Sequence, residues 1–181
     1  MSSSVKRLVY LALLTALAVV LMFFEFPLLP SAGHLKLDFS FVCILVAALL
    51  YGNKDAILVT LIVNGIFYLL KGDLSGLPIG AFANSIALIS YLLVFVFWQK
   101  KDKLLLGCVV ATIAVTVIMF LANYYFITPL YFGILGIPLQ EDFFMYCVLT
   151  VGLFNLIRWS IISIANYILN SWLTKFVDQI N

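Results

Sequence analysis

The chain has 181 residues, of which 65% are hydrophobic and only 10% are charged, and its mean hydropathy is +1.20. Soluble globular domains contain about 45–50% apolar and about 25% charged residues, so the composition excludes a water-soluble domain. The 16 Phe, 9 Tyr and 3 Trp likewise exclude a disordered chain. The net charge of +2 requires no nucleic-acid partner. The class that remains is an integral membrane protein.

Segments without Asp, Glu, Lys or Arg mark the predicted membrane helices, because a helix needs about 20 mostly apolar residues to cross a bilayer. In chain order these segments are residues 8–24, 39–53, 56–70, 74–99, 104–140, 143–157 and 159–174. The last two are separated only by Arg158 and are read as one helix. The second and third are short for a full crossing. The sequence therefore predicts an all-α integral membrane protein, with six transmembrane helices in a single domain over residues 1–181.

The fifth segment is interrupted by prolines and glycines, namely Pro129, Gly133, Gly136 and Pro138. Because proline removes a backbone hydrogen-bond donor, this pattern predicts that the fifth helix ends near Thr128 and that a loop follows. The predicted outer loops are then residues 30–38, 71–79 and 129–142, which are longer and more polar than the inner connections 53–55 and 99–103. We expect the outer face to bind the ligand, because loops concentrate binding function.

The distribution of Lys and Arg predicts the orientation, because cytoplasmic loops are enriched in these residues. With both termini in the cytoplasm, the inner segments hold seven of the ten cations, Lys6, Arg7, Lys54, Lys100, Lys101, Lys103 and Lys175. The outer loops hold two, Lys36 and Lys71, and Arg158 lies within a helix. We therefore expect a multi-pass protein of the cell membrane. A cleaved signal peptide is the alternative for the first segment, but the apolar run is long and Pro30 is unfavourable near a cleavage site.

Arg158 is the most informative residue of the sequence. A guanidinium inside a membrane helix is costly unless it faces a cavity or a partner, so its default interpretation is a functional site. Asn155 lies about one helical turn before it, and Trp159 follows Asn155 at the i+4 position. Together these residues would present a planar donor group, an amide and an aromatic wall to one pocket. The alternative is a structural arginine paired with Asp, Glu or backbone carbonyls.

The apolar segments contain three further asparagines, Asn64, Asn84 and Asn123. An unpaired amide in lipid is costly, and each of these alone is compatible with a contact between helices. Amides and aromatic residues that converge with one cation indicate a site for a polar small molecule. Glu25 and the Lys36/Asp38 pair are candidates for gate or ligand groups, or for interface charges in water.

The sequence contains little that supports metal or catalytic chemistry. Its single His and its cysteines lack metal-binding spacing, and we interpret Cys43, Cys108 and Cys147 as packing residues. It contains no phosphate-binding Gly-rich loop, so we expect no cofactor in this chain and ATP use only by partner proteins. A membrane-embedded enzyme would need a positioned base, which the apolar segments lack. An autonomous secondary transporter would be indicated by inverted repeats, which are not evident.

Several short motifs occur along the chain in a characteristic order. They begin with Ala12-x-x-x-Ala16, Phe-Glu-Phe-Pro-Leu at residues 24–28 and Leu-Lys-Leu-Asp-Phe-Ser at 35–40. Gly-Ala-Phe-Ala-Asn follows at 80–84, Ala-Asn-Tyr-Tyr-Phe-Ile-Thr-Pro-Leu-Tyr at 122–131 and Phe-Asn-Leu-Ile-Arg at 154–158. In this order and at this spacing, the chain resembles the substrate-binding S components of energy-coupling factor (ECF) vitamin transporters, in particular their riboflavin-type branch.

The resemblance implies a six-helix binder that captures a vitamin from outside and works with a transmembrane coupling subunit and two ATPases. It implies docking to the coupling subunit through Ala12 and Ala16. By motif match, Asn123, Asn155 and Arg158 would be polar contacts to the vitamin. Four further residues would lie near the pocket, namely Leu35, Lys36, Asp38 and Asn84.

Some departures from the riboflavin-type pattern bear on the identity of the vitamin. Such members commonly have Lys in place of Arg158, Lys in place of Val63, and Gly-Glu-Leu where residues 80–82 read Gly-Ala-Phe. An arginine keeps the charge but presents a bidentate fork, which suits a carboxylate or paired carbonyls. Riboflavin is neutral with two ring carbonyls, whereas pantothenate carries a carboxylate. Riboflavin is therefore the first expectation, with pantothenate or another vitamin as the alternative.

Overall fold

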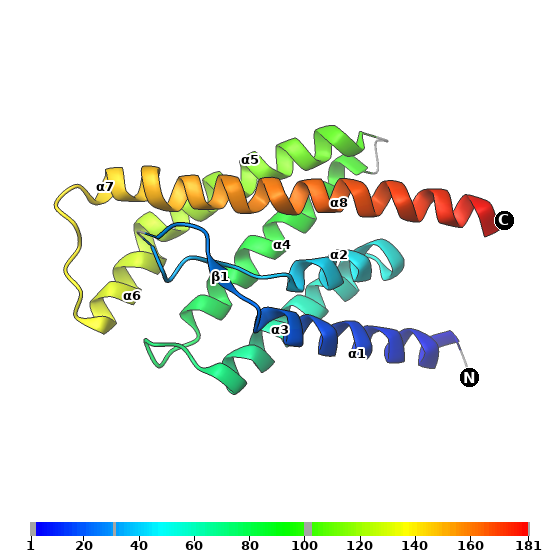
Figure 1. Ribbon diagram of the computed structural model, residues 1–181, viewed down its shortest axis with the longest axis horizontal. Coiled ribbons are helices and arrows are strands. Elements are labelled where there is room, and N and C mark those ends of the chain that lie inside the picture. Colours follow the sequence, from blue (N-terminus) through cyan, green and yellow to red (C-terminus); the bar gives the residue numbers. More distant parts are fainter. Residues whose placement is uncertain (1–2, 31, 100–102, 181) are drawn as a thin grey trace.

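The structure is a computed structural model that describes residues 3–30, 32–99 and 103–180 (Figure 1). Its main helices are α1 (Ser3–Met22), α2 (Ser40–Tyr51), α3 (Asn53–Lys71), α4 (Ile79–Gln99), α5 (Leu104–Ala122), α6 (Thr128–Leu135), α7 (Phe143–Tyr146) and α8 (Leu153–Ile180). Two π-helical turns, η1 (Asn123–Ile127) and η2 (Cys147–Gly152), connect α5 to α6 and α7 to α8. Two short strands, β1 (Phe26–Pro27) and β2 (Lys36–Leu37), pair antiparallel, a small departure from the all-α prediction.

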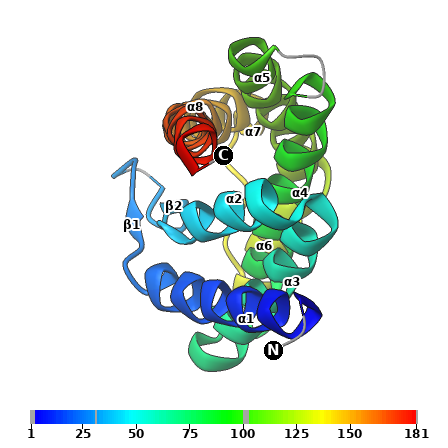
Figure 2. The same ribbon diagram turned by 90° about the vertical axis from the view of Figure 1, so that its right-hand side faces the viewer.

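The helices have the length and composition of membrane spans. Among the described residues, five are long and apolar enough to cross a bilayer, Ser4–Met22, Asn53–Lys71, Ile79–Gln99, Leu104–Leu135 and Phe143–Trp172. With the 12-residue α2 they correspond to the six predicted helices. A helix as short as α2 needs cover from protein, and α2 packs against α1, α3 and α8 (Figure 2).

The third helix is longer than the sequence predicts. It begins at Asn53, directly after Gly52, whose φ of +90° makes the turn, and it has 19 residues. The predictions of a short third helix and of an inner connection over residues 53–55 are therefore wrong. Asp55 is tolerated in the first turn because Arg7 of α1 donates two hydrogen bonds to its carboxylate, at 2.7 and 2.6 Å. Asp55, whose charge suggested a helix boundary, instead forms an ion pair with Arg7 that links α3 to α1.

The fifth helix also continues beyond its predicted end. It passes through η1 and α6 and ends at Leu135, so the prediction of a loop after Thr128 is wrong. Pro129 falls in the first turn of α6, directly after the wide π turn, where its missing N–H costs little. Gly136 then ends the helix in a left-handed conformation with φ +67°. The connection between α6 and α7 is thereby reduced to residues 136–142.

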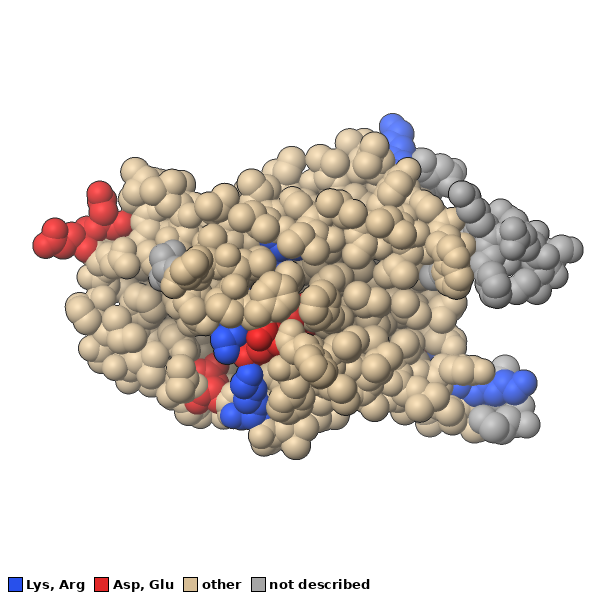
Figure 3. Space-filling view, in the orientation of Figure 1, with Lys and Arg blue, Asp and Glu red and all other residues tan. Residues whose placement is uncertain are grey.

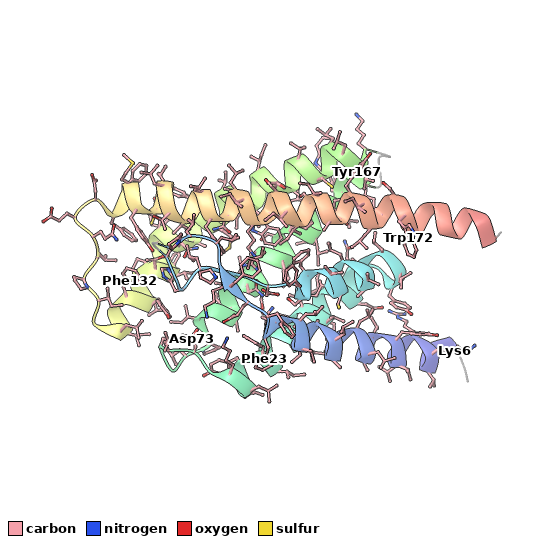
Figure 4. The ribbon with its side chains drawn as sticks, viewed as in Figure 1. Lys6, Phe23, Asp73, Phe132, Tyr167 and Trp172 are labelled. Atoms are coloured by element: carbon pink, nitrogen blue, oxygen red, sulfur yellow. The ribbon has the colours of Figure 1, made fainter. Side chains whose placement is uncertain are left out.

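The helices run so that α1 begins and α8 ends at the same end of the bundle (Figure 1). Figure 4 places Lys6 and Trp172 toward that end, and Asp73 and Phe132 toward the other. The main apolar cluster of the interior includes Ile44, Leu92 and Trp159, each fully buried, and a smaller second cluster is formed by Phe132, Tyr146, Cys147 and Val151. Large apolar side chains such as Leu13 and Ile164 face outward, as expected for helices surrounded by lipid.

Candidate binding cavity

The end of the bundle away from the termini contains a cavity of about 380 Å³. Its walls come from the loop between α1 and α2, from α3 and α4, and from α5, η1, α6 and α8. The volume lies within the range of small-molecule sites, about 300–1,000 Å³. The bundle therefore encloses a space suited to one small molecule.

The structure brings together most of the residues that the sequence singled out. The cavity is lined by Leu35, Lys36, Asp38, Asn84, Asn123, Asn155 and Arg158, and also by Glu25 and Asn64. Trp159 does not line it. This side chain is fully buried, stacks on Tyr91 at a centroid distance of 5.0 Å, and donates from Nε1 to Asn155 Oδ1 at 3.3 Å. Trp159 thus supports Asn155 from behind instead of forming a wall of the cavity.

A chain of side-chain hydrogen bonds fixes Arg158. Asn64 Nδ2 donates to the backbone carbonyl of Thr60 at 2.9 Å, so Asn64 Oδ1 is left to accept from Asn84 Nδ2 at 2.8 Å. Asn84 must then present its own Oδ1, which accepts a hydrogen bond from Arg158 Nη2. Each amide is oriented by the one before it. Two of the intramembrane asparagines therefore act through Arg158 as well as lining the cavity.

Arg158 also faces a carboxylate. Its Nη2 lies 3.6 Å from Asp38 Oδ2, and both residues are buried, at 8% and 6% exposure. Asp38 is held at the start of α2, where its Oδ1 accepts from the backbone N–H of Ser40 at 2.9 Å and from the Ser40 hydroxyl. The charge of Arg158 is thus matched inside the protein.

Two asparagines lie beside the π turns, which are frequent at functional sites. Asn123 is the first residue of η1, and its Nδ2 donates to Met119 O at 2.8 Å. Asn155 follows η2, and its Nδ2 donates to Val151 O at 2.9 Å. Each amide keeps a second N–H and an acceptor lone pair for further bonds. The two can therefore hydrogen-bond a ligand without losing their own orientation.

An ionic cluster closes the mouth of the cavity. Glu25 follows α1, and its Oε1 accepts from Lys36 Nζ at 2.6 Å and from Lys71 Nζ at the end of α3. Burial raises the pKa of Glu25, but the hydrogen bonds and the positive charges of the two lysines together lower it by more, so the net pKa is below its ordinary value. Figure 3 shows acidic and basic side chains gathered below the middle of the face, apart from the red side chains at its left edge and the blue ones toward its right. The cluster ties β1, β2 and α3 together over the cavity.

The tip of the same loop is held by aromatic side chains. His34 Nε2 lies 3.3 Å from the Tyr146 hydroxyl, and the imidazole stacks on Tyr131 at a centroid distance of 6.0 Å. Phe132 meets the ring edge to face at 5.9 Å. Burial lowers the pKa of His34 below its ordinary value of 6.5. The loop between α1 and α2 therefore packs on α6 and α7 as a cap.

Sequence reasoning missed the apolar walls and part of the charge. The cavity is also lined by Phe67, Tyr68, Lys71, Asp73, Met119, Tyr131, Phe132 and Phe154. The aromatic residues resemble ordinary lipid-facing positions, and no periodic signal separates the two roles. From the sequence, Lys71 and Asp73 belong to a predicted loop and are indistinguishable from solvent-exposed charges. Including them, the lining has three carboxylates, Glu25, Asp38 and Asp73, and three cations, Lys36, Lys71 and Arg158, so the two signs balance.

Metal chemistry finds no support in the described residues. Among the side chains that the structure describes, which end at residue 172, no three His, Cys, Asp or Glu residues are grouped closely enough to hold a metal ion. Cys43, Cys108 and Cys147 are buried in α2, α5 and η2. An apolar helical bundle with a partly open cavity, whose mostly apolar walls carry a few polar and charged side chains, defines the class as a membrane-embedded binder of a small molecule.

Comparison with known proteins gives the family. The family described as ECF transporter, substrate-specific component, matches residues 6–170. The chain therefore belongs to this family of S components, which are multi-pass membrane proteins of transporters.

Individual relatives match over nearly the full length. The riboflavin transporter FmnP of Bacillus subtilis is 32% identical, and the alignment covers 97% of this chain and 95% of that protein. The riboflavin transporter RibU of Staphylococcus aureus is 33% identical, with 97% and 94% covered. A solved S component of a bacterial ECF transporter superposes with a TM-score of 0.78 at 32% identity, covering 97% of this chain and 99% of that one.

Proposed function

We propose that this chain is a riboflavin-binding S component, which captures riboflavin at the outer face of the membrane. With a transmembrane coupling subunit and two ATPases it delivers the vitamin to the cytoplasm. The observation that carries the proposal is the environment of Arg158. Its guanidinium is matched by Asp38 at 3.6 Å, in a cavity whose charges balance. A neutral ligand with ring carbonyls suits this site better than a carboxylate does.

The amides support a role in ring recognition. Asn123 and Asn155 are both buried and both line the cavity. Each Oδ1 already accepts one hydrogen bond, from Thr128 Oγ1 or Trp159 Nε1, which leaves each amide one N–H and one acceptor lone pair. Riboflavin offers ring carbonyls as acceptors and a ring N–H as donor. Tyr131 and Phe132 supply aromatic surface in the same cavity, on which a flat ring system can stack. The similarity to riboflavin transporters over nearly the full length supports the same assignment.

The orientation follows from charge. Lys6, Lys54 and Lys103 belong to segments at the end where α1 begins, whereas the cavity lies at the other end. The enrichment of Lys and Arg in cytoplasmic loops places both termini inside, so all six helices cross the membrane as one domain and the cavity opens outward.

Docking to the coupling subunit uses α1. Ala12 and Ala16 lie one turn apart and are both exposed on this helix. Small residues at this spacing allow another membrane helix to approach closely. We assign ATP hydrolysis to the partner subunits, and this chain acts as a binder and not as an enzyme.

The test is ligand identification followed by titration. Protein purified in detergent is expected to be yellow, to release riboflavin on denaturation, and to bind riboflavin but not pantothenate in calorimetry. Arg158→Ala should lose the flavin, whereas Lys103→Ala, which removes an exposed cation at the opposite end, should keep it. Colourless protein that binds pantothenate and ignores riboflavin would refute the substrate assignment and leave the family intact.

A further inference from the structure

The three carboxylates that line the cavity differ in the groups that contact them. Glu25 is held by two lysines at the mouth, and Asp73 by the backbone N–H and hydroxyl of Ser75 and by the N–H of Gly80, at 2.9–3.0 Å. Asp38 has the same kind of local contacts with Ser40, but its second oxygen faces Arg158. Among the described carboxylates, it is the one paired with a cation deep inside the bundle.

Arg158 is held facing Asp38 through one of its nitrogens. The chain of bonds from Thr60 through Asn64 and Asn84 ends on Nη2, the same nitrogen that lies 3.6 Å from Asp38 Oδ2. Any acceptor that approaches the guanidinium therefore meets a group whose charge is already balanced. Both partners are more than nine-tenths buried, so solvent screens their interaction weakly.

We propose that Asp38 is a specificity-determining residue, which makes the guanidinium of Arg158 a donor for neutral carbonyls and disfavours a ligand carboxylate at that guanidinium. The inference rests on the proposed function for the identity of the neutral ligand. A ligand carboxylate at Arg158 would share a poorly solvated space with the carboxylate of Asp38, and this repulsion is absent for a ketone or amide oxygen. Asp38, which precedes α2, thus discriminates between charged and neutral ligand groups at Arg158 of α8.

The variant that tests this is Asp38→Asn, which keeps the shape of the side chain and an oxygen for the N–H of Ser40. The matched control is Asp73→Asn, which removes the same charge from the same cavity at a carboxylate with similar serine contacts but no paired arginine. The probes are riboflavin, pantothenate, and pantothenol, the neutral alcohol with the pantothenate skeleton. Binding is measured by titration calorimetry on the full chain in detergent.

We expect the wild-type protein to bind riboflavin tightly, to bind the neutral pantothenol only weakly at high probe concentration, and to bind pantothenate at least about tenfold more weakly than pantothenol. Asp38→Asn should raise the affinity for pantothenate relative to pantothenol by about tenfold or more, because it removes the repulsion between two carboxylates at one guanidinium. For unit charges about 4 Å apart in a poorly solvated site, this repulsion exceeds a tenfold factor. Asp73→Asn should change this ratio by less than about threefold, since its carboxylate is not paired with Arg158. Asp38→Glu, which restores the charge, should again bind pantothenate more weakly than pantothenol.

The outcomes separate the two proposals. If the affinity for pantothenate relative to pantothenol is unchanged in Asp38→Asn, or rises equally in Asp73→Asn, the proposed role of Asp38 is overturned. Riboflavin binding by the wild-type protein would still uphold the proposed function. A wild type that ignores riboflavin overturns the proposed function itself. If Asp38→Asn does not fold, Arg158→Lys decides, because it keeps both charges. That variant should still bind pantothenate more weakly than pantothenol, and equal or tighter binding of pantothenate would contradict the proposal.

Discussion

The hydrogen-bonded chain that positions Arg158 gives a quantitative prediction for Asn84→Ala. The truncation removes the bond from Asn84 Nδ2 to Asn64 Oδ1 and the bond from Arg158 Nη2 to Asn84 Oδ1. A neutral hydrogen bond contributes about 1 kcal/mol and one to a charged group about 1.5–3 kcal/mol. Both former partners are buried, so no water compensates them fully. The free energy of unfolding should fall by about 3 kcal/mol.

The assay is unfolding in detergent micelles titrated with a denaturing surfactant, with riboflavin titration alongside. Ser85→Ala is the matched control, because it lies next to Asn84 on α4 and loses one hydrogen bond to its own helix, from Oγ to Ala81 O at 2.8 Å. This control should cost about 1 kcal/mol or less. Riboflavin affinity should fall about tenfold in Asn84→Ala, because Arg158 is then less ordered in the free protein and loses conformational entropy on binding. It should be unchanged in Ser85→Ala.

The reasoning also predicts that these residues are coupled. Asn64→Ala and Asn84→Ala remove a shared interaction, so the double variant should lose less stability than the sum of the single variants, by about 1 kcal/mol. A loss in Asn84→Ala no larger than in Ser85→Ala would refute the reasoning, because Arg158 would then be positioned without the chain of amides.

Three further predictions concern the cap and the docking helix. Glu25→Gln should speed riboflavin dissociation by roughly threefold in stopped flow, with weaker dependence on salt, because two ion pairs close the mouth. The lowered pKa of His34 means that an open loop takes up a proton below about pH 6.5 while the closed loop resists it, so dissociation should quicken from about pH 7.5 to about pH 5.5. His34→Gln should lose that quickening, and an unchanged pH profile would contradict this cause. Replacing Ala12 and Ala16 with Trp should abolish co-purification with the coupling subunit and spare riboflavin binding; a complex that still assembles would refute the docking assignment.

The pH behaviour of Glu25 acts in the same direction but in a lower range. Its pKa is depressed by the two lysines, so its contribution to closure is present above the ordinary pKa and is lost as the pH falls through the lowered one. The effect of His34 begins near neutrality, whereas that of Glu25 requires stronger acid. Measuring dissociation across both ranges therefore separates the two residues, and each single variant should remove only its own phase.

Much of the architecture was predictable from the distribution of apolar and charged residues along the sequence. Lipid cannot satisfy backbone groups, so long apolar segments must form helices, and charges mark where they end. The same cost argument found Arg158 and the intramembrane asparagines, since polar groups at such depth require partners or a ligand. The two errors in helix bounds have separate causes. At α3 the charge of Asp55 suggested a boundary but is paired with Arg7, and after Thr128 the helix accommodates Pro129 directly after a π turn.

The sequence by itself determined that this chain is a membrane protein with a small set of costly polar residues, because hydropathy and burial cost are local properties. Only the tertiary structure decided how those residues combine. The pairing of Arg158 with Asp38, the position of Trp159 behind Asn155, and the aromatic walls of the cavity each depend on contacts between helices far apart in the chain. Such contacts depend on helix register and packing, for which a single sequence carries no periodic signal.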